Sequence, residues 1–283
     1  MIYKYAPFSK FTLENITKCQ VSCRHFSQFN DPFEFWSIIE RGEPHPDVDP
    51  LRYQRALKAW DFETSYSEDV RDYFEEIRGY QLDFDQVFKG VRISCFARQP
   101  DNLLMWSHYA DGLRGVCLEF DEERLIANNT DAQMIDVHYS EKPDYVDAFE
   151  YALANDQIWY CEVAYEETKN KSYLDERPRL WDIINRTIVA AFATKPIEWQ
   201  YERECRLIIQ SDMASDLQFH AYPIDALKRI IVGQRAREED LQQLEQAISA
   251  TGASIPIAEA SCVRDRYRLE ITDATSRKLT CAS

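Results

Sequence analysis

The chain has 283 residues, 33 of them basic and 49 acidic, and its formal net charge of −16 argues against a broad nucleic-acid or anionic-membrane surface, which needs clustered Lys and Arg. A hydrophobic fraction of 45% with 29% charged residues is typical of a globular protein and excludes the disordered and collagen-like classes. No apolar run approaches the roughly 20 residues of a membrane-spanning helix, and MIYKYAPFSK lacks a signal-peptide core, so we expect a cytoplasmic protein.

The amino-terminal segment is predicted to contain a strand, a helix and a second strand. The strand covers residues 2–5, and Thr12 can cap a short helix over residues 13–18. The second strand begins at Val21 and leaves its sheet at the turn Asn30-Asp31-Pro32, because Asn and Asp bond their own backbone and Pro fixes φ.

The next segment, about residues 37–90, is rich in charged and aromatic residues and shows no β-alternation. Helical patterns over residues 51–59 and 67–78 predict a helical insertion that packs on a sheet.

The most regular pattern is strand, short helix, strand over residues 91–121. Residues 91–96 (VRISCF) predict a strand, Asp101 can cap a helix over residues 102–110, and Gly112 ends that helix. Residues 114–120 (RGVCLEF) predict the following strand.

The second half is predicted to alternate strands with helices. A strand over residues 134–139 precedes a second helical insertion, about residues 144–194, and a loop from Glu198 then leads into a strand ending at Ile209. Further elements are a strand over 227–232, a helix over 237–250, and strands over 255–257 and 267–271. These elements predict one α+β domain over residues 1–283 with inserted helices, and neither GxGxxG nor a Walker loop is present.

Eight cysteines are scattered through the chain and no two form a CxxC pair. Buried thiols in a reducing compartment explain them, and a structural zinc site is disfavoured because paired ligand spacing is lacking.

The first candidate site is Glu202-Arg203-Glu204-Cys205-Arg206. On a strand, Glu202, Glu204 and Arg206 would share one face, with Cys205 and Leu207 on the core side. Two carboxylates beside a guanidinium can hold a sugar hydroxyl and offset positive charge on its ring. The alternative interpretation is a solvated face with a weak ion pair.

Two further segments carry candidate ligand-binding residues. Trp106, His108 and Tyr109 lie on the short helix. Either Trp106 and Tyr109 pack in the core and His108 is a hydrogen-bonded structural residue, or His108 or Tyr109 edges a pocket and stacks on a ring. Asn30 and Asp31 either cap their own turn or present polar groups to a ligand.

Several cations lie near predicted strand ends and would form a local anion site if they converged on one cleft. They are Lys4, Arg24, Arg92, Arg98, Arg114 and Arg206.

The order of motifs YKY, FNDPFE, ISCFA, LLMWSHYADGLRGVCLEF, EWQYERECR and IIVG resembles the bacterial family designated domain of unknown function 2971. The resemblance covers almost the whole chain and implies an order of elements without an activity.

A weaker resemblance links the chain to the ADP-ribosyltransferase fold, whose late strand often carries Glu-x-Glu, as in Glu202-Arg203-Glu204. It implies a mixed, mostly antiparallel split sheet with inserted helices, Glu204 as the catalytic acid and Glu202 as its partner. NAD would then be the substrate, the acceptor is unspecified, and a toxin or phage-defence effector is the implied setting.

The same analogy assigns roles around NAD. Lys4, Arg24 or Arg206 would hold the pyrophosphate, and Trp106 or Tyr109 would stack on nicotinamide. Tyr5, which lies beside Lys4, joins the residues expected around the cofactor, as do Asn30, Asp31, His108 and Arg114.

Two other functions are retained as alternatives. A metal-dependent nuclease or hydrolase would use Glu119, Glu202, Glu204 and His108 around a divalent ion. A non-catalytic sensor or interaction module would leave Glu204 and Arg206 in mutual surface pairs.

Overall fold

The computed structural model describes residues 1–60, 68–79, 89–129, 132–211 and 215–273. The chain divides into two compact units. Unit 1 comprises residues 1–32, 90–139 and 197–283, and unit 2 comprises residues 33–89 and 140–196. The sequence predicted one domain with two helical insertions, and these insertions make up most of unit 2.

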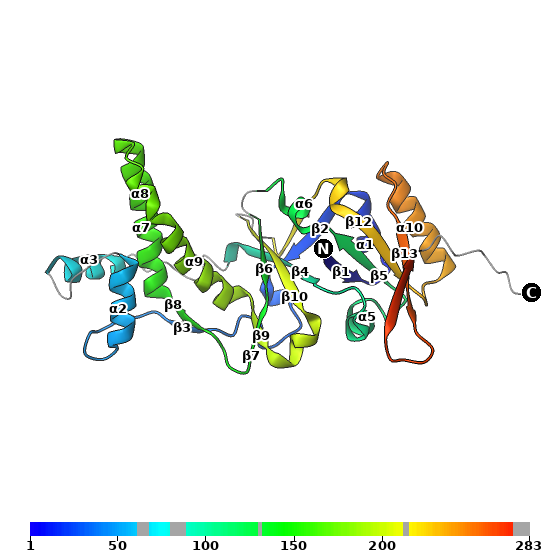
Figure 1. Cartoon of the computed structure of the whole chain (residues 1–283), viewed down its shortest axis with the longest axis horizontal. Coiled ribbons are helices and arrows are strands. Elements are labelled where there is room, and N and C mark those ends of the chain that lie inside the picture. Colours follow the sequence, from blue (N-terminus) through cyan, green and yellow to red (C-terminus); the bar gives the residue numbers. More distant parts are fainter. Residues whose placement is uncertain (61–67, 80–88, 130–131, 212–214, 274–283) are drawn as a thin grey trace, which may run out of the picture. The chain divides into compact units, whose positions relative to one another are not determined.

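Unit 1 is an α+β unit built on a mixed, mostly antiparallel sheet (Figure 1). Its strands are β1 (Ile2–Ala6), β2 (Gln20–Arg24), β4 (Val91–Ala97), β5 (Val116–Phe120), β6 (Gln133–Asp136), β10 (Glu204–Gln210), β11 (Leu217–Ala221), β12 (Leu227–Gly233), β13 (Ile257–Cys262) and β14 (Leu269–Asp273). Its helices are α1 (Lys10–Thr17), η1 (Phe26–Gln28), α5 (Leu103–Tyr109), α6 (Glu122–Ile126), η2 (Ile197–Glu202), η3 (Ile224–Ala226) and α10 (Glu238–Ala250).

The sheet branches at β4. One edge of β4 pairs with β10 along its full length, from Val91 opposite Gln210 to Ala97 opposite Glu204. The other edge pairs with β1 at Ala97 and with β2 at Ile93, so these two strands diverge from β4. From β1 the sheet continues through β5, β12, β13 and β14, and β12 and β13 are parallel.

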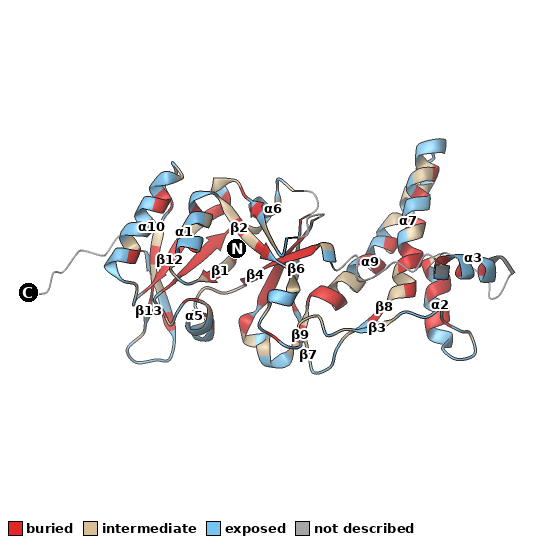
Figure 2. Cartoon of the chain, turned by 180° about the vertical axis from the view of Figure 1, so that it is seen from behind, coloured by how far each residue is buried: buried red, intermediate tan, exposed pale blue. Residues whose placement is uncertain are grey.

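The core of unit 1 lies on both faces of this sheet, and its central strands are buried (red in Figure 2). Cys205 and Leu207 of β10 pack with Phe96 and Phe120 in one cluster. Ala97, Met105 and Trp106 belong to the cluster on α5. Burial of apolar surface, at about 25 cal/mol per Å², supplies most of the stabilisation of such a core.

Unit 2 is mainly helical, as the helical patterns in the two insertions predicted. Its helices are α2 (Pro50–Ala59), α3 (Glu68–Gly79), α7 (Ala148–Thr168), α8 (Ser172–Asp175) and α9 (Arg177–Phe192), and β3 (Ile38–Glu40) pairs in parallel with β8 (Tyr145–Asp147). Two short strands, β7 (His138–Ser140) and β9 (Thr194–Pro196), lie where the chain passes between the units.

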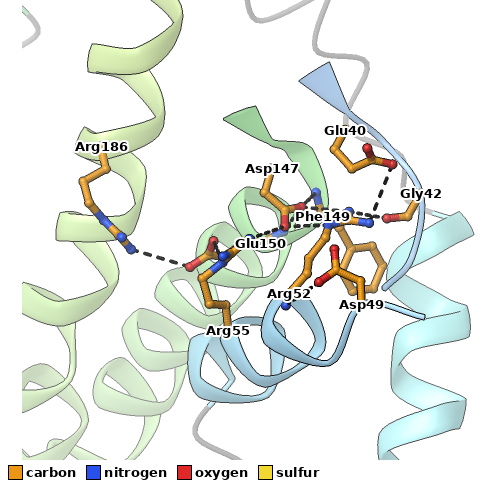
Figure 3. Close-up of polar contacts among 9 residues, drawn as sticks. All are labelled: Glu40, Gly42, Asp49, Arg52, Arg55, Asp147, Phe149, Glu150 and Arg186. Carbon is orange, nitrogen blue, oxygen red and sulfur yellow. Dashed lines mark hydrogen bonds and ion pairs between the residues drawn. The ribbon is translucent and has the colours of Figure 1, made fainter. Parts of the chain in front are cut away.

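The core of unit 2 contains a buried ion pair that ties α2 to the start of α7 (Figure 3). The Arg52 Nε and Nη2 atoms donate to the two Asp147 carboxylate oxygens over 2.7 and 2.9 Å. Asp147 also caps α7, because its Oδ1 accepts the backbone N–H groups of Phe149 and Glu150.

Several predicted boundaries need correction. Ser9, not Thr12, caps α1, and Asn102, not Asp101, caps α5, where its Oδ1 accepts the N–H groups of Leu104 and Met105. The strands β3 and β11 were not predicted, because short strands of mixed polarity give little periodic signal. Ser67, the predicted start of the second helix, lies outside the described residues.

Candidate functional site

The late strand β10 places Glu204 and Arg206 on one face and buries both. Glu204 is 4% exposed and Arg206 is fully buried. The Arg206 Nε donates to Glu204 Oε1 over 2.8 Å and its Nη2 to Oε2 over 3.3 Å. Cys205 and Leu207 point to the core, as the alternation predicted. The pair is therefore an internal ion pair rather than a solvated one.

The amino-terminal Lys4 reaches the same stretch of β4 from the neighbouring strand. Its Nζ donates to Ser94 Oγ over 2.8 Å and to the Cys95 carbonyl over 3.1 Å, and it lies 5.0 Å from the centre of the Phe96 ring. Burial lowers the pKa of Lys4, although the nearby Glu204 carboxylate opposes this effect. The structure thus brings Lys4 near the Glu204–Arg206 pair, and none of the three lines the hollow described below.

Glu202 departs from the predicted strand. The 3₁₀ helix η2 ends at Glu202, and Arg203 adopts a left-handed φ of 43°, so β10 begins only at Glu204. Glu202 is 3% exposed, and its Oε1 accepts the Tyr109 hydroxyl over 2.5 Å. The two acids of the Glu-x-Glu motif therefore serve different partners: Glu204 an arginine in its own strand, and Glu202 a tyrosine on α5.

A surface hollow of about 400 Å³ lies beside the Tyr109–Glu202 contact. It is lined by Asn30, His108, Tyr109, Glu198, Trp199 and Tyr201. The His108 and Tyr201 ring centres are 6.3 Å apart, and those of Trp199 and Tyr201 are 6.1 Å apart. A wall of aromatic rings joined by polar groups, here including Asn30 and Glu198, is typical of a small-ligand site.

The position of α5 is fixed by a small number of contacts. Asn102 caps the helix and its side-chain amide donates to the Tyr201 carbonyl, which joins α5 to η2. The loop after α5 turns back, since Gly112, with φ 59°, donates its N–H to the Trp106 carbonyl over 3.0 Å. These contacts hold His108 and Tyr109 at the hollow.

Two residues predicted to contact the cofactor lie in the core instead. Trp106 is fully buried, its Nε1 donates to the Pro100 carbonyl over 2.8 Å, and its ring meets that of Tyr5 edge to face at 5.4 Å. The Tyr5 hydroxyl donates to the Gln99 carbonyl over 2.8 Å, and burial raises its pKa. Both side chains hold α5 against β1 and present no ring to the hollow.

The other predicted site residues are dispersed. Arg24 is exposed, with its guanidinium 5.9 Å from the Phe11 ring centre, and Asp31 is 6% exposed. Arg114 lies in the loop after α5, where its Nη1 donates to the Asp111 carbonyl over 3.1 Å. Of the predicted set, Asn30, His108 and Tyr109 meet at the hollow, and Glu202 contacts Tyr109.

Three lining residues were not singled out from the sequence: Glu198, Trp199 and Tyr201. The available signal was the run EWQYE, in which two aromatic residues precede the buried acid. This run was predicted to be a loop leading into a strand, which assigns its aromatic residues to no face, whereas the structure forms the 3₁₀ helix η2 there.

The four residues proposed as metal ligands do not assemble. Glu119 pairs with Arg229, at 2.6 Å, while Glu202 and Glu204 contact Tyr109 and Arg206. Across the described ranges, no group of three or more His, Cys, Asp or Glu residues could hold a metal ion. In the same residues, no helix combines the length and apolar character that crossing a membrane demands.

The comparisons with known proteins agree with the motif resemblance. A family model described as protein of unknown function (DUF2971) matches residues 105–207. This segment carries both His108 and Tyr109 of α5 and the run from Glu198 to Arg206, so the predicted resemblance to this family is confirmed over these residues. No curated protein and no solved structure matches the chain.

Proposed function

We propose that this chain, which matches the DUF2971 family model over residues 105–207, binds NAD in the hollow beside α5 and cleaves the bond between nicotinamide and ribose. One observation carries the proposal: Tyr109 lines an aromatic hollow, and the buried Glu202 carboxylate holds its hydroxyl at 2.5 Å. NAD is here a substrate, and either water or another acceptor receives the ADP-ribosyl group.

The hollow suits the oxidised nicotinamide ring in shape and charge. Trp199, Tyr201 and His108 offer flat ring faces, and the ring of oxidised nicotinamide is a planar cation. A cation over the face of Trp or Tyr is stabilised by about 0.5–2 kcal/mol. Glu198 on the wall and Glu202 behind Tyr109 add negative charge of the sign that a pyridinium attracts.

The bond broken joins C1′ of ribose to the ring nitrogen of nicotinamide. The bonding electron pair leaves with the ring, which becomes neutral, while positive charge develops on ribose as in glycoside cleavage. The acceptor oxygen then bonds to C1′ and loses a proton, which Glu202 can accept directly or through Tyr109. The buried Glu202 carboxylate also offsets the positive charge of the oxocarbenium-like transition state. This electrostatic stabilisation is expected to lower the barrier more than the proton transfer does.

This assignment reverses the roles of the two acids inferred from sequence. Glu204 was expected to be catalytic, yet both of its carboxylate oxygens accept hydrogen bonds from Arg206. Glu202 contacts a residue of the hollow and is therefore the better candidate for the reacting acid. Glu204, with Arg206 and Lys4, would then stabilise the branch point of the sheet.

The branching of the sheet adds support for an ADP-ribosyltransferase-like fold. Divergence of β1 and β2 from one edge of β4 makes a split sheet, with the acid pair at the start of β10 on the other edge. A fold analogy alone does not establish an activity, so the proposal depends on the hollow.

The test is to incubate the purified protein with NAD and to measure the released nicotinamide by chromatography. Trp199→Ala and Tyr109→Phe should each lower the release at least about tenfold, since they remove a ring face or the hydroxyl that Glu202 holds. Trp181→Ala is the matched control, because Trp181 is a 39% exposed indole on α9 of unit 2. Equal rates in all four proteins would contradict the proposal.

A non-catalytic nucleotide sensor is the second candidate, favoured by the mutual pairing of Glu204 and Arg206. That pair is buried rather than on the surface, unlike the pairing expected for a simple interaction module. A sensor would bind NAD with the same dependence on Trp199 and release no nicotinamide.

A further inference from the structure

Two arginines converge on the loop that follows α5. In this loop Asp111, Gly112 and Leu113 all have positive φ, at 48°, 59° and 68°. The loop closes by a hydrogen bond of 2.9 Å from the Gly115 N–H to the Ala110 carbonyl. This hydrogen bond closes a tight turn over residues 110–115, and Arg114 lies within that turn.

Arg235 reaches the same loop from the end of β12. Val232 of β12 lies opposite Val116 of β5, and the Arg235 N–H donates to the Leu113 carbonyl over 2.9 Å. The approach requires glycine at position 233, where an added Cβ would lie 2.1 Å from the Leu113 carbonyl oxygen. The sheet register thus brings Arg235 to Arg114, 121 positions earlier in the chain.

The guanidinium groups of Arg114 and Arg235 lie on either side of Gly112. An added Cβ on Gly112 would lie 3.7 Å from Arg114 Nη1 and 3.8 Å from Arg235 Nη1. These same atoms donate to the carbonyls of Asp111 and Gly112, over 3.1 and 3.3 Å. Each guanidinium has five N–H donors, so most of its donor capacity is left for a ligand.

Little negative charge compensates this pair. The Asp111 carboxylate lies 3.9 Å from Arg114 and is 62% exposed. The next arginine, Arg237, is engaged by Asp240 through two contacts of 2.8 and 2.9 Å. Within the described part of the chain, Arg235 has no carboxylate partner, although the whole chain has a net charge of −16.

We infer that Arg114 and Arg235 bind the diphosphate of the dinucleotide substrate, an inference that rests on the proposed function. Two neighbouring guanidiniums match phosphate oxygens in charge and in hydrogen-bonding geometry. The Gly112 N–H bonds to the Trp106 carbonyl, which folds this loop onto the last turn of α5, next to His108 and Tyr109 of the hollow.

The cations first assigned to the pyrophosphate are engaged elsewhere. Arg206 is fully buried against Glu204, Lys4 donates to Ser94 and Cys95, and Arg24 lies over Phe11. Arg114 was among the predicted ligands, whereas Arg235 was not, because its contribution depends on the pairing of β12 with β5.

A purely structural role must be distinguished from binding. Cations near a helix C-terminus stabilise it, and both guanidiniums bond to carbonyls of the loop after α5. In that role, substitutions would lower the melting temperature without changing affinity for an anion.

The experiment is calorimetric titration of the full chain with inorganic pyrophosphate at low ionic strength. Arg114→Gln and Arg235→Gln should each weaken binding about tenfold or more, and Arg235→Lys should lie between wild type and Arg235→Gln. The control is Arg124→Gln, which removes a 60% exposed arginine of α6, beyond the opposite end of β5. Affinity in this control should match that of the wild type.

Two results would overturn the inference: wild type that does not bind pyrophosphate, or Arg114→Gln and Arg235→Gln variants that bind as tightly as wild type. Titration with nicotinamide separates this failure from failure of the proposed function, because nicotinamide carries no phosphate and probes the hollow alone. Loss of pyrophosphate binding with unchanged nicotinamide binding supports the assignment. Loss of pyrophosphate binding in a chain that never binds nicotinamide would retain the anion site and refute the NAD proposal.

Discussion

In unit 2 the Arg52 guanidinium is buried and contacts only other protein groups that hold the fold together. In unit 1 the Glu202 carboxylate is also buried, but it bonds to a side chain that lines a hollow. Arg52 bonds to Asp147 and to the Gly42 carbonyl, and lies 3.8 Å from Glu40 (Figure 3). Glu202 holds Tyr109, whose ring lines the hollow. Both regions bury a charged group. They differ because Asp147, the partner of Arg52, is itself buried, whereas Tyr109, the partner of Glu202, lines a hollow that a ligand can reach.

A buried charge with a structural role has no partner that a ligand can reach, whereas a buried charge with a functional role has one. The Asp147 oxygens accept hydrogen bonds from Arg52 and from the first turn of α7, so the pair joins α2 to α7. Both side chains are buried and neither is accessible to a ligand. Glu204 with Arg206 resembles this case. The Tyr109–Glu202 contact is different because one of its members lies at a surface that a ligand can reach.

The first prediction concerns the stability of unit 2. Arg52→Met removes one partner of a buried ion pair and leaves the Asp147 carboxylate with only the more distant Arg55, at 3.9 Å, so it should lower the free energy of unfolding by about 3–5 kcal/mol. Urea denaturation followed by circular dichroism measures this loss.

The control lies in the same network. Arg186, which is 67% exposed and 3.5 Å from Glu150, forms a surface ion pair worth roughly 0–1 kcal/mol. Arg186→Gln should therefore unfold close to wild type. An Arg52→Met variant that unfolds at the same urea concentration as Arg186→Gln would show that the buried pair is not what joins α2 to α7.

The second prediction contrasts the two acids of unit 1. Glu202→Gln should lower nicotinamide release by about 10²–10³-fold, the usual cost of removing a preorganised charge from a reacting centre. Glu204→Gln should instead lower stability, because it leaves the Arg206 guanidinium buried without its carboxylate.

Both variants are assayed at a temperature where circular dichroism shows each to be folded. The opposite ranking, with Glu204→Gln inactive and Glu202→Gln active, would restore Glu204 as the catalytic acid and would leave Glu202 with a structural role.

Local patterns in the sequence predicted the elements around the site. The run from Val91 to Phe120 gave strand, helix and strand because apolar alternation, a capping residue and Gly112 act within a few residues of each other. The buried face of β10 followed from alternation in the same way. The family motifs also lie in this region.

The remaining features depend on contacts that no local pattern encodes. The left-handed φ of Arg203 ends the Glu-x-Glu alternation, and such a conformation is uncommon for a residue with a side chain. Trp106 and Tyr109 lie three positions apart on one helix, yet one is core and the other lines the hollow, which depends on the placement of η2. The meeting of Arg114 with Arg235 requires the register of β5 with β12.

The third prediction tests the charge preference of the hollow. Wild type should bind 1-methylnicotinamide, a cation, more tightly than neutral nicotinamide. Glu198→Gln should reduce this preference about twofold to fivefold, because Glu198 is exposed and its charge is partly screened. Competition measured by nuclear magnetic resonance at low and high salt gives the ratio, and an unchanged ratio would remove Glu198 from the recognition of the ring.

The last prediction concerns Lys4, whose buried amine bonds to neutral groups, Ser94 Oγ and the Cys95 carbonyl, rather than to a carboxylate. Burial lowers its pKa below the usual 10.5, so between the folded pKa and 10.5 the unfolded chain binds more protons than the folded one. Stability attributable to Lys4 should therefore rise with pH in that window, by at most about 1.4 kcal/mol per pH unit.

The measurement of this effect is a difference between wild type and Lys4→Met in urea denaturation at pH 7.5, 8.5 and 9.5. Tyrosines whose pKa burial raises, such as Tyr5 and Tyr222, act in the opposite direction at high pH, but they are present in both proteins and cancel. A difference that grows in favour of wild type as pH rises fits an amine that is costly to charge where it lies. A difference in the free energy of unfolding that shrinks as pH rises would mean that Glu204 stabilises the charged Lys4 more strongly than burial destabilises it. Lys4 would then behave like the buried ion pairs Arg52–Asp147 and Arg206–Glu204.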